Sequence, residues 1–149
     1  MDSSKPKRIS LQIPNGLWND MLEHARSAKP NECVGLLFGQ ADGLVRERFP
    51  LVNASASPTA FLSDARSMLE AEKRRRKTGW DWLAVYHSHP TSPPVPSRKD
   101  LAEHLSPAVV CLIISLMQKD PDVAGYWIEN DSFESALISV ISHEEEGNS

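Results

Sequence analysis

The strongest restriction on the fold comes from the segment "AVVCLIISL", residues 108–116, which is an almost uninterrupted apolar run. A strand of this kind is apolar on both of its faces, so both faces must be covered by other parts of the chain. The segment therefore predicts a central, buried strand. We expect it to lie in a sheet with a long helix on each side.

The rest of the chain supplies further strands and helices around this segment. Short apolar or alternating runs predict the other strands, at residues 8–13, 31–40, 44–53, 82–89, 124–130 and 133–141. Helical spacing with start and stop signals predicts helices over residues 14–29, about 63–79 and 97–105, and residues 54–59 are a loop by composition. This order predicts an α/β or α+β fold with a mixed sheet. The last two strands form a hairpin unless that region contains a helix.

Size and composition indicate one globular domain. With 149 residues, 40% of them hydrophobic, we assign residues 8–142 to a single domain, 1–7 to a flexible leader and 143–149 to a flexible tail. The net charge of −4 disfavours nucleic-acid binding. No window approaches the roughly 18 apolar residues that cross a membrane, so we expect a soluble protein. Cys33 and Cys111 lie in apolar segments and fit reduced thiols in a cytoplasm.

Two histidines end the strand predicted at residues 82–89. Residues two apart on a strand point to the same side, so His87 and His89 can present both imidazoles to one point, while Ser88 faces away. This arrangement suits a metal ion. An H-x-H pair taken alone is explained better by local hydrogen bonds at a strand end.

The stretch "PSRKD" predicts a helix start with Ser97 at the cap and Asp100 at the third helical position. A carboxylate in a first turn is stabilised by the helix dipole without any metal. If the proline-rich loop of residues 90–96 folds back, Asp100 also reaches the two histidines as a third ligand. Three protein ligands with one open position are typical of catalytic zinc.

Glu32 is the candidate for a base. It lies in "PNECVGLLFG", an apolar context in which burying an unpaired glutamate is costly. An exposed glutamate just before a strand is the alternative. Hydrolysis of an amide by a zinc-activated water needs a group that takes the water's proton and passes it to the leaving nitrogen.

Together these residues resemble the signature of the JAMM (MPN-plus) metallopeptidases, E…H-[ST]-H-x(7)-S-x-x-D. Glu32 stands in "ECVGLLFG", His87 and His89 in "HSHP", and Ser97 and Asp100 in "SRKD", with seven residues between His89 and Ser97. The resemblance extends over nearly the whole chain, from the first strand and helix to the closing hairpin. The chain lacks the long insertions of the eukaryotic deubiquitinating members and is closer in size to the small bacterial and archaeal ones.

The resemblance implies a zinc peptidase with a cytidine-deaminase-like fold. It implies that His87, His89 and Asp100 bind Zn²⁺, that Glu32 is the general base, and that Ser97 donates a hydrogen bond to the developing oxyanion. The implied substrate is the C-terminal Gly-Gly end of a ubiquitin-like or sulfur-carrier protein, cleaved at a peptide or isopeptide bond. Neither the individual substrate nor the oligomeric state follows from the sequence.

Two other functions are compatible with the same residues. The first is a non-catalytic scaffold of the same fold, although such relatives typically lack the ligands that this chain keeps. The second is a different metal-dependent reaction on the same ligands, since two histidines and a carboxylate also bind iron. A zinc deaminase is disfavoured because that class needs an H-x-E motif together with a P-C-x-x-C motif, and this sequence contains no P-C-x-x-C motif. His104 is interpreted as an ordinary helix-surface histidine, and the alternative is an additional partner of the site.

Overall fold

The computed structural model describes residues 8–53, 65–104 and 106–142. Within these residues the chain forms eight strands and three helices. In chain order they are β1 (Leu11–Pro14), α1 (Asn15–Ala28), β2 (Val34–Gly39), β3 (Val45–Leu51), α2 (Ala65–Thr78), β4 (Asp81–His89), α3 (Arg98–Glu103), β5 (Val110–Ser115), β6 (Asp122–Glu129), β7 (Ser132–Ala136) and β8 (Ile138–Ile141). None of these helices has the length and apolar composition that crossing a membrane requires.

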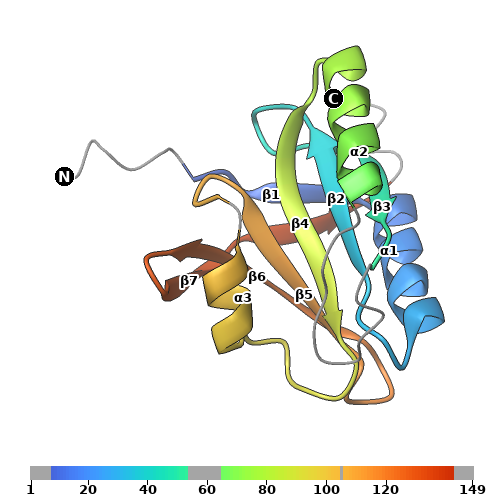
Figure 1. Ribbon diagram of the computed structural model, residues 1–149, viewed down its shortest axis with the longest axis vertical. Helices are drawn as coiled ribbons and strands as arrows, with labels where there is room; N and C mark the ends of the chain where they lie inside the picture. Colours follow the sequence, from blue (N-terminus) through green and yellow to red (C-terminus); the bar gives the residue numbers. More distant parts are fainter. Residues whose placement is uncertain (1–7, 54–64, 105, 143–149) are drawn as a thin grey trace.

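Six of the strands form one mixed sheet in the order β3-β2-β4-β5-β6-β7 (Figure 1). Strands β4 and β5 run parallel, and the other neighbours are antiparallel. Every residue of β5 is buried, which confirms the prediction of a central strand for this apolar segment. A separate parallel pair is formed by β1 and β8.

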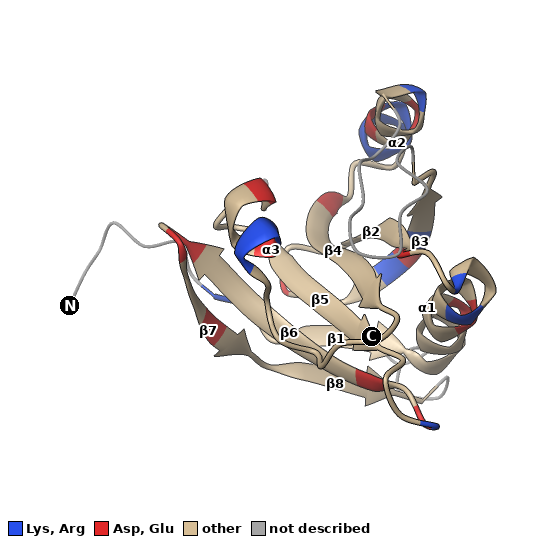
Figure 2. Cartoon of the chain, turned by 60° about the horizontal axis from the view of Figure 1, so that its bottom comes forward, with Lys and Arg blue, Asp and Glu red and all other residues tan. Residues whose placement is uncertain are grey.

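The two faces of the sheet are covered by different elements. Figure 2 shows α2 and α3 above the sheet, and α1 with the β1–β8 pair below it. Because side chains alternate along a strand, successive residues of β4 from 84 to 86 belong to different layers. Ala84 and Tyr86 pack in the cluster on the α1 side, whereas Val85 packs in the cluster that contains Ala71 of α2. The predicted α+β fold with helices on both faces is confirmed.

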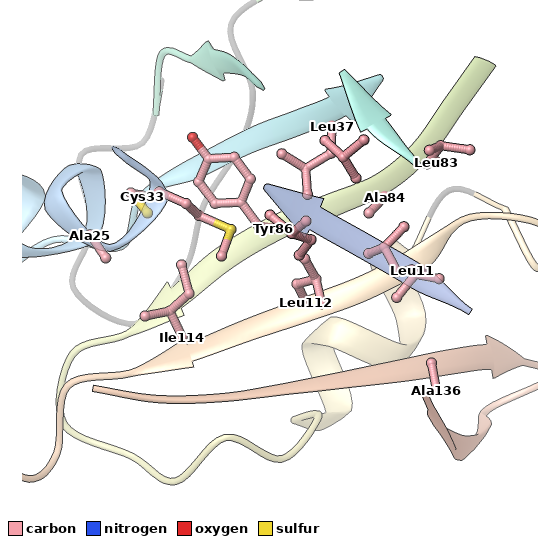
Figure 3. Packing of buried hydrophobic residues seen from close by; sticks show 14 of the residues in the cluster. Leu11, Ala25, Cys33, Leu37, Leu83, Ala84, Tyr86, Leu112, Ile114 and Ala136 are labelled. Carbon is pink, nitrogen blue, oxygen red and sulfur yellow. The ribbon is translucent and has the colours of Figure 1, made fainter. Parts of the chain in front are cut away.

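Tyr86 of β4 contacts residues of α1, β2 and β3 on the α1 side of the sheet. Its ring lies inside the apolar cluster (Figure 3), fully buried, and Gly35 of β2 is its cross-strand partner. A Cβ atom on Gly35 would lie 2.2 Å from Cζ of Tyr86, so only glycine admits the ring. The phenol oxygen contacts Nδ1 of His24 at 2.7 Å and accepts a hydrogen bond from Arg48 at 3.0 Å. The part of β4 next to the two histidines is therefore held rigidly.

The end of the chain differs from the prediction. The strand expected over residues 133–141 is divided into β7 and β8, and no helix is present there in the part of the chain that the structure describes. Strand β8 leaves the main sheet because it pairs with β1, and the carbonyl of Leu137 at the break accepts a hydrogen bond from the Leu11 amide at 2.9 Å. The helix predicted over residues 14–29 begins at Asn15, because Pro14 is the last residue of β1 and the N-cap of α1. The loop predicted for residues 54–59 lies outside the described residues.

Candidate metal centre

Four buried polar side chains come together where β4 ends. His87 and His89 belong to the end of β4, Glu32 precedes β2 by two residues, and Asp100 is the third residue of α3. Their exposed fractions are 4% for Glu32, 1% for His87, 6% for His89 and 8% for Asp100. Ionisable side chains are rarely buried to this extent unless they are paired or bind a metal. The structure thus places the four residues in one enclosed polar site.

The distances place His87 between two carboxylates. Its Nδ1 lies 3.7 Å from Oε1 of Glu32, and its Nε2 lies 3.5 Å from Oδ1 of Asp100. The other Asp100 oxygen, Oδ2, lies 3.0 Å from Nε2 of His89. The Nε2 atoms of both imidazoles therefore lie near the Asp100 carboxylate, while Nδ1 of His87 lies near the Glu32 carboxylate.

The His89 ring is oriented by a backbone carbonyl. Its Nδ1 lies 2.8 Å from the carbonyl oxygen of Pro93. Because a carbonyl oxygen only accepts hydrogen bonds, Nδ1 carries the proton, and in the neutral ring Nε2 then carries a lone pair. This lone pair faces a carboxylate oxygen of Asp100, an arrangement that requires a proton or a metal ion between the two atoms. Histidines that bind metals are typically oriented by such a contact at their other nitrogen.

Ser97 and Asp100 form the predicted capping box at the start of α3. The Asp100 amide donates to Oγ of Ser97 at 3.1 Å, and the Ser97 amide donates to Oδ2 of Asp100 at 2.9 Å. The same Asp100 oxygen also contacts His89. One carboxylate therefore both stabilises the helix start and completes the polar site, which is why the two interpretations of Asp100 are compatible.

The loop between the histidines and α3 is held by three side chains. The carbonyls of residues 92–94 contact, in order, the Ser115 hydroxyl at 2.6 Å, Nδ1 of His89 at 2.8 Å, and the Tyr126 hydroxyl. The prolines restrict the loop, and these contacts fix the direction in which it folds. Sequence reasoning missed Ser115 and Tyr126. A signal was available for Ser115, because it is the one polar residue in the apolar segment 108–116.

The electrostatics of the site favour a positive charge between the carboxylates. Burial alone would raise the pKa of Asp100, but the hydrogen bond with His89 and the charge of His87 lower it to about 2. Burial alone would lower the pKa of His87, but hydrogen bonds with Cys111 and Glu32 raise it. The carboxylates and imidazoles therefore stabilise a bound proton, and a metal cation would benefit from the same field.

Cys111 lies against this site. Its Sγ is 3.6 Å from Nε2 of His87. Burial would raise the pKa of the Cys111 thiol, but hydrogen bonds with His104 and His87 lower it. His104 also contacts the carbonyl of Val109 through Nε2 at 2.9 Å. Cys111 was expected only as a reduced thiol in an apolar segment and His104 as a helix-surface residue, so both lie closer to the site than their sequence context suggested.

The donor set fits a divalent metal ion. Possible ligand atoms of Glu32, His87 and His89 lie within 4.8 Å of one another. The ligand set predicted from the sequence contains Asp100 in place of Glu32, and both carboxylates border His87. Two imidazoles with one carboxylate leave a coordination position open, which is typical of catalytic rather than structural zinc sites.

Comparison with known protein families gives one match that covers most of the chain. Residues 14–129 match the family model described as prokaryotic homologs of the JAB domain. This range includes the whole candidate metal centre, together with Ser97, Cys111 and the loop between β4 and α3.

Individual relatives and solved structures are similar over comparable ranges. A probable TtuB-protein conjugate cleaving protease from Thermus thermophilus is 39% identical over 64% of this chain, and the match spans 64% of that protein, slightly less than two thirds of its length. A CysO-cysteine peptidase from Mycobacterium tuberculosis is 31% identical, with 88% of this chain and 91% of that protein covered. The solution structure of a protein from Desulfitobacterium hafniense superposes with a TM-score of 0.81 at 36% identity, covering 89% of this chain and 94% of that one.

Proposed function

The chain belongs to the prokaryotic homologs of the JAB domain, and on this basis we propose that it is a zinc-dependent metallopeptidase. Its reaction is hydrolysis of a peptide or isopeptide bond at the C-terminal Gly-Gly end of a ubiquitin-like or sulfur-carrier protein. The observation that carries the proposal is the burial of Glu32, His87, His89 and Asp100 around one point. The names of the Thermus and Mycobacterium relatives, which refer to a TtuB conjugate and to CysO-cysteine, support the substrate class.

His87, His89 and Asp100 would hold the zinc ion. Asp100 is preferred over Glu32 as the carboxylate ligand because the Nε2 atoms of both histidines face it, at 3.5 and 3.0 Å. Glu32 contacts only the Nδ1 side of His87. Bound zinc supplies a Lewis acid that polarises a carbonyl group and lowers the pKa of water to about 7.

Glu32 acts as the general base and then as the general acid. Its carboxylate takes a proton from the attacking water and delivers it to the leaving amine when the C–N bond breaks. Its burial, with 4% of the residue exposed, keeps bulk water away and strengthens its interaction with charge that develops during the reaction. Among the described residues, the buried carboxylates are those of Glu32 and Asp100. Because Asp100 is assigned to the metal, Glu32 is the one that can serve as the base.

Ser97 donates a hydrogen bond to the oxygen of the scissile carbonyl. In the capping box its Oγ accepts a hydrogen bond from the Asp100 amide. The hydroxyl proton therefore stays available for the substrate, and one residue can serve the helix and the reaction together. Contacts of this kind are worth about 3 kcal/mol in acyl transfer.

We place this reaction in a cytoplasm. The support for this is chemical, because Cys33 and Cys111 are both free thiols and both buried. Disulfides are the usual state of paired cysteines in oxidising compartments.

The test uses the purified protein and the ubiquitin-like sulfur carriers of its source organism. Each carrier is extended beyond its Gly-Gly end by one amino acid or by a lysine-linked peptide, incubated with zinc-loaded protein, and analysed by mass spectrometry. We expect loss of the extension after the second glycine, and no reaction with the Glu32→Gln variant. Intact substrates in every incubation, with zinc bound at one equivalent, would overturn the proposal in favour of a scaffold function.

A further inference from the structure

The ladder between β2 and β4 ends in an irregular way next to the site. Val34 pairs with His87, so Cys33 lies opposite Ser88. The Ser88 amide donates to the Cys33 carbonyl at 3.2 Å. In a regular antiparallel pair the Cys33 amide would donate to the backbone carbonyl of Ser88 in return. Instead, it donates to the Ser88 hydroxyl oxygen at 2.8 Å.

The peptide group that joins Glu32 to Cys33 is held at both of its polar atoms. Its N–H, from Cys33, donates to Oγ of Ser88 at 2.8 Å. Its carbonyl, from Glu32, accepts a hydrogen bond from Nδ2 of Asn53 at 2.7 Å. A peptide group is planar, so two contacts at opposite edges fix the orientation of the whole plane. The plane includes the Cα atom of Glu32, from which the side chain extends.

We propose that Ser88 and Asn53 are positioning residues that aim the Glu32 carboxylate at the reaction site. The inference rests on the proposed function, because it assumes that Glu32 is the base. Ser88 itself faces away from the metal centre and cannot take part in the chemistry. This role explains why a hydroxyl residue stands between the two histidines. The strand end that presents His87 and His89 also fixes, through Ser88, the position of Glu32 relative to them.

Burial makes the contact with Ser88 hard to replace. Ser88 is 0% exposed and Cys33 is 2% exposed, so water has no access to the Cys33 amide. In Ser88→Ala this amide loses its acceptor, and the peptide plane is then held only at the Glu32 carbonyl. Ser88→Thr keeps the hydroxyl and should keep the orientation. Asn53→Asp keeps the side-chain shape but removes the donor to the Glu32 carbonyl.

The kinetic test compares these variants in their zinc-loaded form on one substrate. For Ser88→Ala we expect kcat to fall by roughly 10²-fold, the usual effect of a displacement of about 1 Å, with KM and zinc affinity unchanged. Ser88→Thr should restore kcat, and Asn53→Asp should lower it in the same way. Ile13→Val, which removes a buried methyl group from β1 in the separate two-stranded sheet, controls for a general loss of stability. It should leave kcat unchanged.

A second readout needs no enzymatic activity. Amide hydrogen exchange at Cys33 should be slow in the wild type and clearly faster in Ser88→Ala, with exchange at Leu36 and Leu37 unchanged. This measurement tests whether Ser88 holds the Cys33 amide, and its result does not depend on peptidase activity. If Ser88→Ala does not fold, the partly exposed Asn53 provides the second variant. The proposal is overturned if Cys33 exchange does not change, if kcat of both variants stays within twofold of wild type, or if Ser88→Ala loses zinc together with activity.

Discussion

Replacement of Ser97 separates the two roles that its hydroxyl group combines. As the N-cap of α3 it accepts a hydrogen bond from the Asp100 amide at 3.1 Å. Loss of a serine cap costs about 1 kcal/mol, which lowers Tm by about 3 °C in a protein of this size. As an oxyanion donor the same hydroxyl is worth about 3 kcal/mol in the transition state, or roughly 10²-fold in kcat. The two losses differ enough to be measured apart.

Three substitutions distinguish these roles. Ser97→Ala removes the cap and the donor, so we expect both losses. Ser97→Gly removes the donor, but glycine is a good N-cap residue and costs only about 0.3 kcal/mol. Ser97→Thr keeps a hydroxyl for both purposes. The expected order of Tm is therefore Ser and Thr, then Gly, then Ala, whereas kcat should be high for Ser and Thr and equally low for Gly and Ala.

The assay pairs thermal unfolding of the zinc-loaded proteins with kcat on one extended carrier substrate, measured well below Tm. Kinetics at saturating substrate avoid a contribution from weaker binding. If Ser97→Gly turns over at nearly the wild-type rate, the hydroxyl is only a cap and the assignment of an oxyanion donor is wrong.

Further substitutions test the site and its support. Glu32→Gln should keep zinc, as measured by metal analysis, while kcat falls by about 10³-fold because the base is removed; comparable activity in the two proteins would refute the assigned base. His89→Ala and Asp100→Asn should instead weaken zinc binding in a metal titration, and wild-type affinity in both would show that the ligands lie elsewhere. Treatment with a chelator should abolish turnover and lower Tm, with recovery of both when zinc is added back, since a ligand that binds only the folded state stabilises it. Gly35→Ala should destabilise the fold by about 3 kcal/mol in urea unfolding, because its Cβ would lie 2.2 Å from the ring of Tyr86; a change below about 0.5 kcal/mol would mean that the ring is free to move.

Local patterns predicted the elements that carry the site. The apolar segment that became β5, the cap at Ser97 and the alternation that aims His87 and His89 to one side are all confirmed. Each depends on residues only a few positions apart, and backbone geometry imposes periods of 2 and 3.6 on such residues. The division of residues 133–141 into β7 and β8 was not predicted, because it depends on pairing between β8 and β1 at the other end of the chain.

Local sequence patterns specify the chemical types at the site: a glutamate before a strand, two histidines at a strand end, and an aspartate in a first helical turn. How these residues meet depends on contacts between distant parts of the folded chain. Ser115 and Tyr126 fold the loop back through its carbonyls, so that Asp100 reaches the histidines. Ser88 and Asn53 hold the peptide group of Glu32. These contacts join residues between 21 and 55 positions apart, and at such separations the topology of the sheet, rather than local periodicity, sets which atoms touch.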